Sequence, residues 1–243
     1  MLFGLFWGDA TLLLVLPAMI FAIIAQIRVK STFQRYDRIA TAERITGAMA
    51  ARRILDENRL QDVRIERVSG HLTDHYDPRA RVIRLSEATH DSISIAALGV
   101  AAHEAGHAVQ HSTGYLPLRI RSAIIPVTQL GSRLAMPIFL IGLLMTAFGY
   151  TDSYGGGIIM SVGIALFSLT ALFQLVTLPT EFNASTRALR TLEASGMLKS
   201  GEIGGARRVL SAAAMTYVAA LAAALASLLR LVLIASRASG RRR

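Results

Sequence analysis

Four long runs without a charged residue constrain this chain more than any other feature. They occupy residues 11–27, 134–150, 157–178 and 209–229, and they account for much of a hydrophobic content of 53%. A helix needs roughly 20 apolar residues to cross a bilayer, and the run at 134–150 lies near the lower limit. The sequence therefore predicts a mainly α-helical membrane protein with about four transmembrane helices.

The basic residues between these runs predict an orientation. Of the 26 Lys and Arg, sixteen lie in residues 28–133 and five in residues 179–208. Cytoplasmic segments are enriched in Lys and Arg, so we expect both segments in the cytoplasm. Asp9 is the only charged residue before the first run, whereas a cleaved signal peptide would have positive residues there. This favours an uncleaved anchor whose N-terminus lies outside. The basic tail "RASGRRR" leaves open whether the last run spans completely.

Charge and cysteine content exclude several classes of site. The net charge of +10 could indicate a nucleic-acid partner, but the sequence has no zinc-finger, RNP or basic-zipper pattern. Basic residues flanking membrane spans explain the charge, so we expect the lipid bilayer and no nucleic acid as partner. There is no cysteine, so any metal must be held by His and carboxylate ligands.

A small α+β module is predicted between the first two runs. Residues 42–58 place apolar side chains on one helical face, and residues 63–68 and 81–86 alternate as strands do. The segment "SGHLTDHYDP" between these strands is typical of a turn. Residues 94–111 predict an apolar helix whose charge-free part, about 11 residues, is too short to span a bilayer.

We expect five consecutive segments along the chain. They are a membrane anchor (1–28), a cytoplasmic module that contains the motif "HEAGH" (29–133), a transmembrane hairpin (134–178), a helix that begins after a proline and carries Glu181 (179–208), and an Ala-rich membrane helix with a basic tail (209–243).

The motif "HEAGH" predicts a metal site. His103 and His107 are four residues apart, so on a helix both imidazoles project from one face and can bind one zinc ion. Glu104 lies on the neighbouring edge of that helix, where its carboxylate can act as general base toward the water that zinc activates. Both roles require the helix predicted at 94–111.

A catalytic zinc needs a third protein ligand, and the residues alone leave several candidates. His111 lies one turn after His107, where a role in supporting the ligands is favoured over direct binding. A polar cluster before the second strand is either a solvated turn or a source of ligands, and consists of His71, Asp74, His75 and Asp77. Glu181 follows Pro179 on a new predicted helix at the cytoplasmic membrane edge, so the predicted topology allows it to meet both histidines.

Three segments together resemble a known family. "GHLTDHYDPRARVIRLSEATH", "SISIAALGVAAHEAGHAVQH" and "LPTEFNASTRALRTLE" closely resemble the YugP-type neutral zinc metallopeptidases of bacterial membranes. The resemblance extends over nearly the whole chain, and more distantly to the HtpX-like membrane gluzincins. It implies a zincin-like module in the bacterial plasma membrane, with the zinc ligands His103, His107 and Glu181 and the base Glu104.

The resemblance also bears on the surroundings of the site. Gluzincins of this kind have an aspartate four residues after the ligand glutamate; Ser185 occupies that position here, and Asn183 is the nearest polar substitute. Residues 82–85 resemble the edge strand that pairs with an extended peptide substrate. Arg187 lies on a different helical face from Glu181, where it could stabilise an oxyanion or pair with Asp74 or Asp77, or instead be a solvated helix charge or contact lipid phosphate.

The expected function is a membrane-anchored zinc endopeptidase that cuts proteins or peptides at the cytoplasmic face. An intramembrane protease of the site-2 type is an alternative, but it would need an aspartate in a later span, and those runs have none. A non-catalytic scaffold or chaperone with a structural zinc is another, but such a site would not need Glu104. The Ala-rich last run leaves an oligomer possible.

Overall fold

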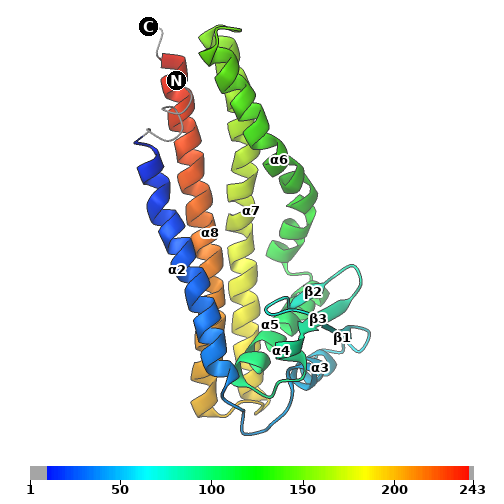
Figure 1. The fold of residues 1–243 in the computed structure, drawn as a ribbon. Helices are drawn as coiled ribbons and strands as arrows, with labels where there is room; N and C mark the ends of the chain where they lie inside the picture. Colours follow the sequence, from blue (N-terminus) through cyan, green and yellow to red (C-terminus); the bar gives the residue numbers. More distant parts are fainter. Residues whose placement is uncertain (1–9, 241–243) are drawn as a thin grey trace. The chain divides into compact units, whose positions relative to one another are not determined.

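The computed structural model describes residues 10–240 and is mainly α-helical (Figure 1). The helices are α2 (Leu12–Asp37), α3 (Gly47–Glu57), α4 (Glu87–His90), α5 (Ile95–Ser112), α6 (Leu116–Ala147), α7 (Ser153–Ala194) and α8 (Ser200–Gly240). The strands are β1 (Arg64–Val68), β2 (His75–Asp77) and β3 (Val82–Ser86). The predicted fold class, long apolar helices with a small α+β part, is confirmed. Asp9 and residues 241–243, which entered the topology prediction, lie outside the described residues.

The contacts between residues divide the chain into two compact units. Unit 1 comprises Met1–Ile24, Ile120–Thr177 and Tyr217–Arg243, and unit 2 comprises Ala25–Arg119 and Leu178–Thr216. This division concerns packing, and the five consecutive segments expected from the sequence stay a prediction about topology.

Four helices are long and apolar enough to cross a membrane, namely α2, α6, α7 and α8. Few side chains in their apolar stretches are buried, and large apolar residues such as Leu13, Ile23, Leu130 and Leu175 are exposed. Soluble proteins rarely expose apolar surface of this extent, whereas lipid tails cover it without cost. The predicted number of helices able to span a membrane is confirmed.

Close helix packing in unit 1 depends on glycine. A Cβ atom on Gly142 would lie 2.7 Å from the backbone nitrogen of Met160, and one on Gly163 would lie 2.7 Å from that of Phe139. The absence of side chains at these positions lets α6 and α7 approach closely, as small residues do in membrane helix pairs. Phe139 and Met160 are fully buried in the core beside this contact.

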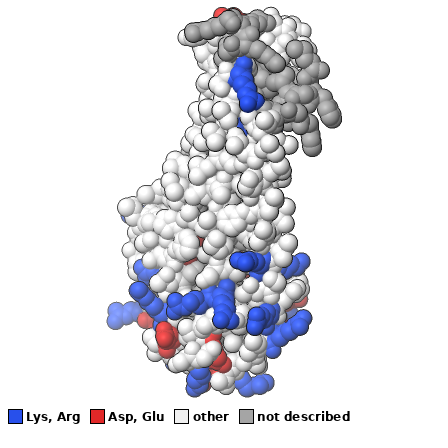
Figure 2. All heavy atoms as spheres, turned by 90° about the vertical axis from the view of Figure 1, so that its left-hand side faces the viewer, with Lys and Arg blue, Asp and Glu red and all other residues white. Residues whose placement is uncertain are grey.

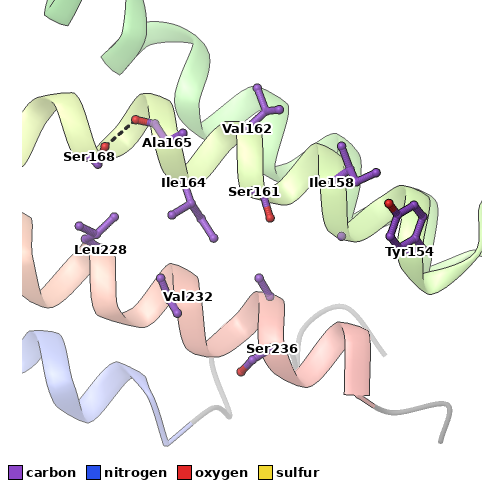
Figure 3. A pocket seen from close by; sticks show the side chains of 12 residues that line it. Tyr154, Ile158, Ser161, Val162, Ile164, Ala165, Ser168, Leu228, Val232 and Ser236 are labelled. Carbon is purple, nitrogen blue, oxygen red and sulfur yellow. Dashed lines mark hydrogen bonds between the residues drawn. The ribbon is translucent and has the colours of Figure 1, made fainter.

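Unit 1 also contains a hollow of about 1110 Å³ between α7 and α8 (Figure 3). Tyr154, Ile158 and Ser161 line it from α7, and Leu228 and Val232 line it from α8. Its described lining includes no His, Asp or Glu, so it offers no side chain of the kinds that bind zinc.

The core of unit 2 surrounds α5. Ser94 begins this helix because its hydroxyl accepts a hydrogen bond from the backbone N–H of Ala97. Small residues then let neighbouring elements approach from several sides, and Ala97, Leu98 and Ala101 are completely buried. A helix buried on most of its circumference shows no single apolar face, which explains the continuously apolar sequence at 94–111.

A three-stranded sheet with the order β1-β3-β2 lies in unit 2. β1 is parallel to β3, with Ile65 opposite Ile83, and β2 is antiparallel to β3, with Tyr76 opposite Ile83. The predicted strands at 63–68 and 81–86 are confirmed. The prediction that residues 82–85 form an edge strand is wrong, because the segment predicted as a turn contains β2, which makes β3 the central strand.

α7 carries one further correction. It is a single helix through Pro179, so the prediction that a new helix begins after this residue is wrong. A proline removes one backbone donor, but long apolar helices tolerate such interruptions, and α6 likewise contains Pro126 and Pro137.

Candidate metal centre

His103 and His107 lie one turn apart on α5, with ring centroids 4.7 Å apart and ring planes at 82°. Both histidines direct Nε2 toward the same atom, Oε2 of Glu181 on α7, at 3.2 Å from His103 and 3.5 Å from His107. Candidate ligand atoms of all three residues lie within 4.8 Å of one another. We call His103, His107 and Glu181 the metal centre.

The donor set fits zinc. Two imidazole nitrogens and one carboxylate oxygen are a common ligand set of catalytic zinc, and tetrahedral ligands at about 2 Å from the ion lie roughly 3.3 Å apart. The distances from Glu181 to the two histidines are close to that separation. The Glu181 side chain is only 2% exposed, and a carboxylate buried to this extent needs charged or hydrogen-bonding partners.

Gly106, inside the motif, allows α7 to reach α5. A Cβ atom at this position would lie 2.9 Å from the backbone oxygen of Ala184. Glu181 precedes Ala184 by three residues, close to one helical turn, so this contact holds its carboxylate at the level of the histidines.

The opposite nitrogens of both imidazoles are held by side chains. His103 Nδ1 lies 3.1 Å from the Ser185 hydroxyl, and His107 Nδ1 lies 2.9 Å from Oε1 of Gln110. Gln110 Nε2 donates to the backbone oxygen of Thr180 at 2.8 Å, and a carbonyl can only accept, so the orientation of the Gln110 amide is fixed. His107 Nδ1 must then carry the proton, which leaves the Nε2 lone pair facing the metal centre.

Charge in the metal centre acts on His107. Burial disfavours the charged imidazolium, but the hydrogen bond to Glu181 and the negative charges of Glu104 and Glu181 outweigh it, so the pKa of His107 is raised. Binding of a metal ion therefore competes with protonation of His107.

Glu104 lies next to His103 on α5 and is 8% exposed. Its negative charge contributes to the raised pKa of His107, which places it in the electrostatic environment of the metal centre. Within residues 10–240 no side chain forms a hydrogen bond with its carboxylate, which is therefore free to accept one from water.

Comparison with known proteins agrees with this geometry. Residues 11–236 match the family described as "Putative neutral zinc metallopeptidase". The chain belongs to this family. It is also 47% identical over 210 residues to "Putative membrane protease YugP" of Bacillus subtilis (strain 168), covering 86% of this chain and 89% of that protein. No solved structure matches the chain. The family resemblance expected from the sequence is confirmed, and membership implies zinc as the metal.

The polar cluster before β3 forms hydrogen bonds that stabilise the sheet. Asp74 accepts hydrogen bonds from the backbone N–H and the hydroxyl of Ser86, which fixes the start of β2 against the end of β3. His75 Nδ1 bonds the carbonyl of Thr73. Asp77 accepts from the backbone of residues 79 and 80 and pairs with an arginine of β3. His71, Asp74, His75 and Asp77 do not belong to the metal-ligand group found in residues 10–240.

His111 joins the metal-binding helix to the sheet. Its Nδ1 lies 2.9 Å from the Tyr76 hydroxyl on β2, and the two ring centroids are 5.9 Å apart. Burial raises the pKa of Tyr76, so the phenol stays protonated and can donate to the imidazole.

Asn183 contacts Gln110, the residue that holds His107, and Arg187 contacts Asn183. Asn183 Oδ1 accepts from Gln110 Nε2 at 3.0 Å and from Arg187 Nε at 2.8 Å, and it does not contact either histidine. The predicted pairing of Arg187 with Asp74 or Asp77 is wrong. Those carboxylates bond elsewhere, whereas Asn183 lies one turn away on the same helix as Arg187.

Two residues that contact the metal centre, Gln110 and Ser185, were given no role from the sequence, although Ser185 was placed at the position of the aspartate of related peptidases. Gln110 follows His107 by three residues, and Ser185 follows Glu181 by four, so each lies one helical turn from a candidate ligand. That spacing was the available signal for both.

Proposed function

We propose that this metallopeptidase is a membrane-bound zinc endopeptidase whose ligands are His103, His107 and Glu181 and whose general base is Glu104. The observation that carries the proposal is the convergence of two Nε2 atoms on one buried oxygen of Glu181, 78 residues distant from His103. A buried carboxylate between two imidazoles is a typical metal-ligand arrangement.

The chemistry assigns separate tasks to these residues. Zinc, when bound, supplies Lewis-acid polarisation and makes a nucleophile available at neutral pH. Glu104 accepts the proton of the attacking water and passes it to the leaving amine. Gln110 and Ser185 orient the two imidazoles through their Nδ1 atoms.

The edge of the sheet at β2 is suited to an extended peptide substrate. Of the described strands, only β3 pairs with β2, so one side of β2 has no strand partner. Tyr76 of β2 bonds His111, which lies one turn after His107, so this edge is tied to the metal-binding helix. A peptide added to β2 would receive backbone hydrogen bonds there. β2 thus replaces residues 82–85 as the proposed substrate strand.

We place the catalytic module at the cytoplasmic face of a bacterial plasma membrane. On the face drawn in Figure 2, Lys and Arg gather over the elements of unit 2, while the surface of the apolar helices is almost free of charge. Such a distribution favours the cytoplasmic side, where basic residues also contact anionic lipids. The name of the Bacillus relative, a membrane protease, supports this location.

The Glu104→Gln variant tests the mechanism. Purified in detergent, it should keep zinc at the wild-type stoichiometry, measured by elemental analysis, and lose cleavage of an unfolded protein substrate by about 10²- to 10⁴-fold. Glu193→Gln changes an exposed glutamate of α7 and should cleave normally. Wild-type rates for Glu104→Gln would refute the proposed base. If the Glu104→Gln variant keeps a biological function that depends on zinc, the result would instead support the non-catalytic scaffold or chaperone.

A further inference from the structure

A second, smaller hollow lies within unit 2, on α5, α3 and α7, with a volume of about 190 Å³. Its lining includes Gly106 of α5, Asn58 at the end of α3, and Arg187, Arg190 and Thr191 of α7. We call it the arginine hollow. None of the metal centre residues lines it, so it is distinct from the proposed catalytic site.

The two arginines of this hollow are not among the arginines of unit 2 that pair with carboxylates. Arg52, Arg53 and Arg84 each pair with a carboxylate of Asp56, Glu57 and Asp77, respectively. Neither Arg187 nor Arg190 forms an ion pair with any residue of the described part of the chain.

The hydrogen-bonding groups of these arginines remain available to a ligand. Arg187 uses only Nε, which donates to Asn183, so both of its terminal nitrogens are free of bonds to described residues. Arg190 forms no side-chain hydrogen bond with residues 10–240. Arg187 and Arg190 are three residues apart on α7, so their side chains are neighbours on the helix surface.

We infer that the arginine hollow binds a phosphate group between Arg187 and Arg190. Guanidinium groups bind phosphate oxygens through two parallel hydrogen bonds, and phosphate has enough oxygens for two such groups. A free phosphate has enough oxygens and charge for two parallel hydrogen bonds to each guanidinium, whereas a lipid phosphodiester has two free oxygens and would present one to each arginine. The volume equals that of about six water molecules at roughly 30 Å³ each, which accommodates a phosphate group with some of its hydration. The Thr191 hydroxyl can donate a further hydrogen bond.

Two sources can supply this phosphate, the headgroup of an anionic lipid and a free phosphate compound. One arm of the test uses lipid-depleted full-length protein in a non-ionic detergent, titrated with inorganic phosphate by calorimetry. The other uses protein in nanodiscs of phosphatidylcholine with or without phosphatidylglycerol, with bound lipid counted by native mass spectrometry.

Arg190→Gln is the deciding variant, because Arg187 also holds Asn183 beside the metal ligands. We expect it to weaken phosphate or phosphatidylglycerol binding at least tenfold, as expected for the loss of one charge-assisted pair. Arg59→Gln removes an exposed charge outside the hollow and should bind like the wild type. Unchanged zinc content and circular dichroism establish that both variants are folded.

Dependence on Arg190 in the detergent arm identifies free phosphate as the ligand, and dependence only in the nanodisc arm identifies the lipid headgroup. Both results support the site. Equal binding by Arg190→Gln and Arg59→Gln in both arms would overturn it. Acetate binding as tight as that of phosphate, lost in Arg190→Gln, would overturn the phosphate assignment.

Discussion

The polar side chains of the two units find their hydrogen-bond partners in different places. In unit 1 the hydroxyls of Thr128, Thr146 and Ser168 donate to carbonyls three or four residues earlier on their own helices. Unit 2 has bonds of this kind too, such as that of Ser112 to Val109 on α5. It also has side-chain bonds that join different elements, as between Ser86 of β3 and Asp74, or between Gln110 of α5 and Thr180 of α7.

This difference follows from what surrounds each unit. A helix in lipid must satisfy its polar groups internally, and a hydroxyl bonded to its own backbone needs no neighbouring helix. A polar bond between elements exists only when both are correctly placed, so it specifies their arrangement. Substitutions of polar residues that join elements of unit 2 should therefore have larger effects than substitutions of hydroxyls bonded to their own helix in unit 1.

Glu181→Gln should have the largest effect on the metal centre. The amide keeps the shape but removes the charge that faces His103 and His107, so zinc affinity should fall by more than about 100-fold, exceeding the loss typical of supporting residues. Chelator competition with purified protein measures this. The matched control is Glu193→Gln, and zinc binding of wild-type strength by Glu181→Gln would exclude it as a ligand.

Gln110→Ala should lower zinc affinity by about 10- to 100-fold, because His107 loses the acceptor that orients it. The absorption spectrum of the cobalt-substituted protein should also change, which a simple loss of stability would not cause. Ser112→Ala, on the same helix, is the control, since its hydroxyl bonds only the carbonyl of Val109. An unaltered cobalt spectrum in Gln110→Ala would count against the positioning role.

Gly106→Ala tests the contact between α5 and α7. The added methyl group meets the backbone of Ala184 and should reduce the free energy of unfolding by about 1–3 kcal/mol, with weaker zinc binding as α7 moves away. Gly201→Ala introduces the same group where no atom lies within 4 Å, and it should be neutral or slightly stabilising. Thermal unfolding of the two variants compares them, and equal stability would remove the role assigned to Gly106.

Two serine substitutions compare the units directly and should give the smallest effects. Ser86→Ala removes a buried hydroxyl that bonds Asp74, and should reduce the free energy of unfolding by about 1–3 kcal/mol. Ser168→Ala removes a hydroxyl bonded to its own helix, and should change it by less than about 0.5 kcal/mol. Denaturation in the same detergent measures both. A larger loss for Ser168→Ala would reverse the comparison between the units.

The sequence was sufficient for properties that depend on pattern alone. Charge-free runs identified the membrane helices, and the four-residue spacing of His103 and His107 identified the metal-binding face of α5. β2 was missed because a strand of three residues within polar, turn-like sequence has no alternation to detect. Without β2, the position of β3 in the sheet could not be known. Pro179 predicted a helix boundary because a proline removes a backbone donor, which the sequence alone shows. Whether a helix continues through a proline depends on its surroundings, and α7 does continue.

The residues around the metal ligands were harder to predict for a different reason. Glu181 could be named because topology and family resemblance indicated it. Gln110 contacts the carbonyl of a residue 70 positions away, and no feature of residue 180 indicates such a contact. Ser185 occupies the position where related peptidases have an aspartate, and its hydroxyl reaches His103 although it carries no charge.

The bond from Gln110 to the carbonyl of Thr180 has a consequence for how this site can evolve. Its donor is a side-chain amide that only a few amino acids could supply at position 110, but its acceptor is a backbone carbonyl, which every amino acid has. Drift at position 180 therefore leaves this bond intact, while nearly every replacement at position 110 breaks it. Pairwise covariation between these positions should be absent despite their direct contact, so this bond between α5 and α7 is hidden from coevolution-based inference.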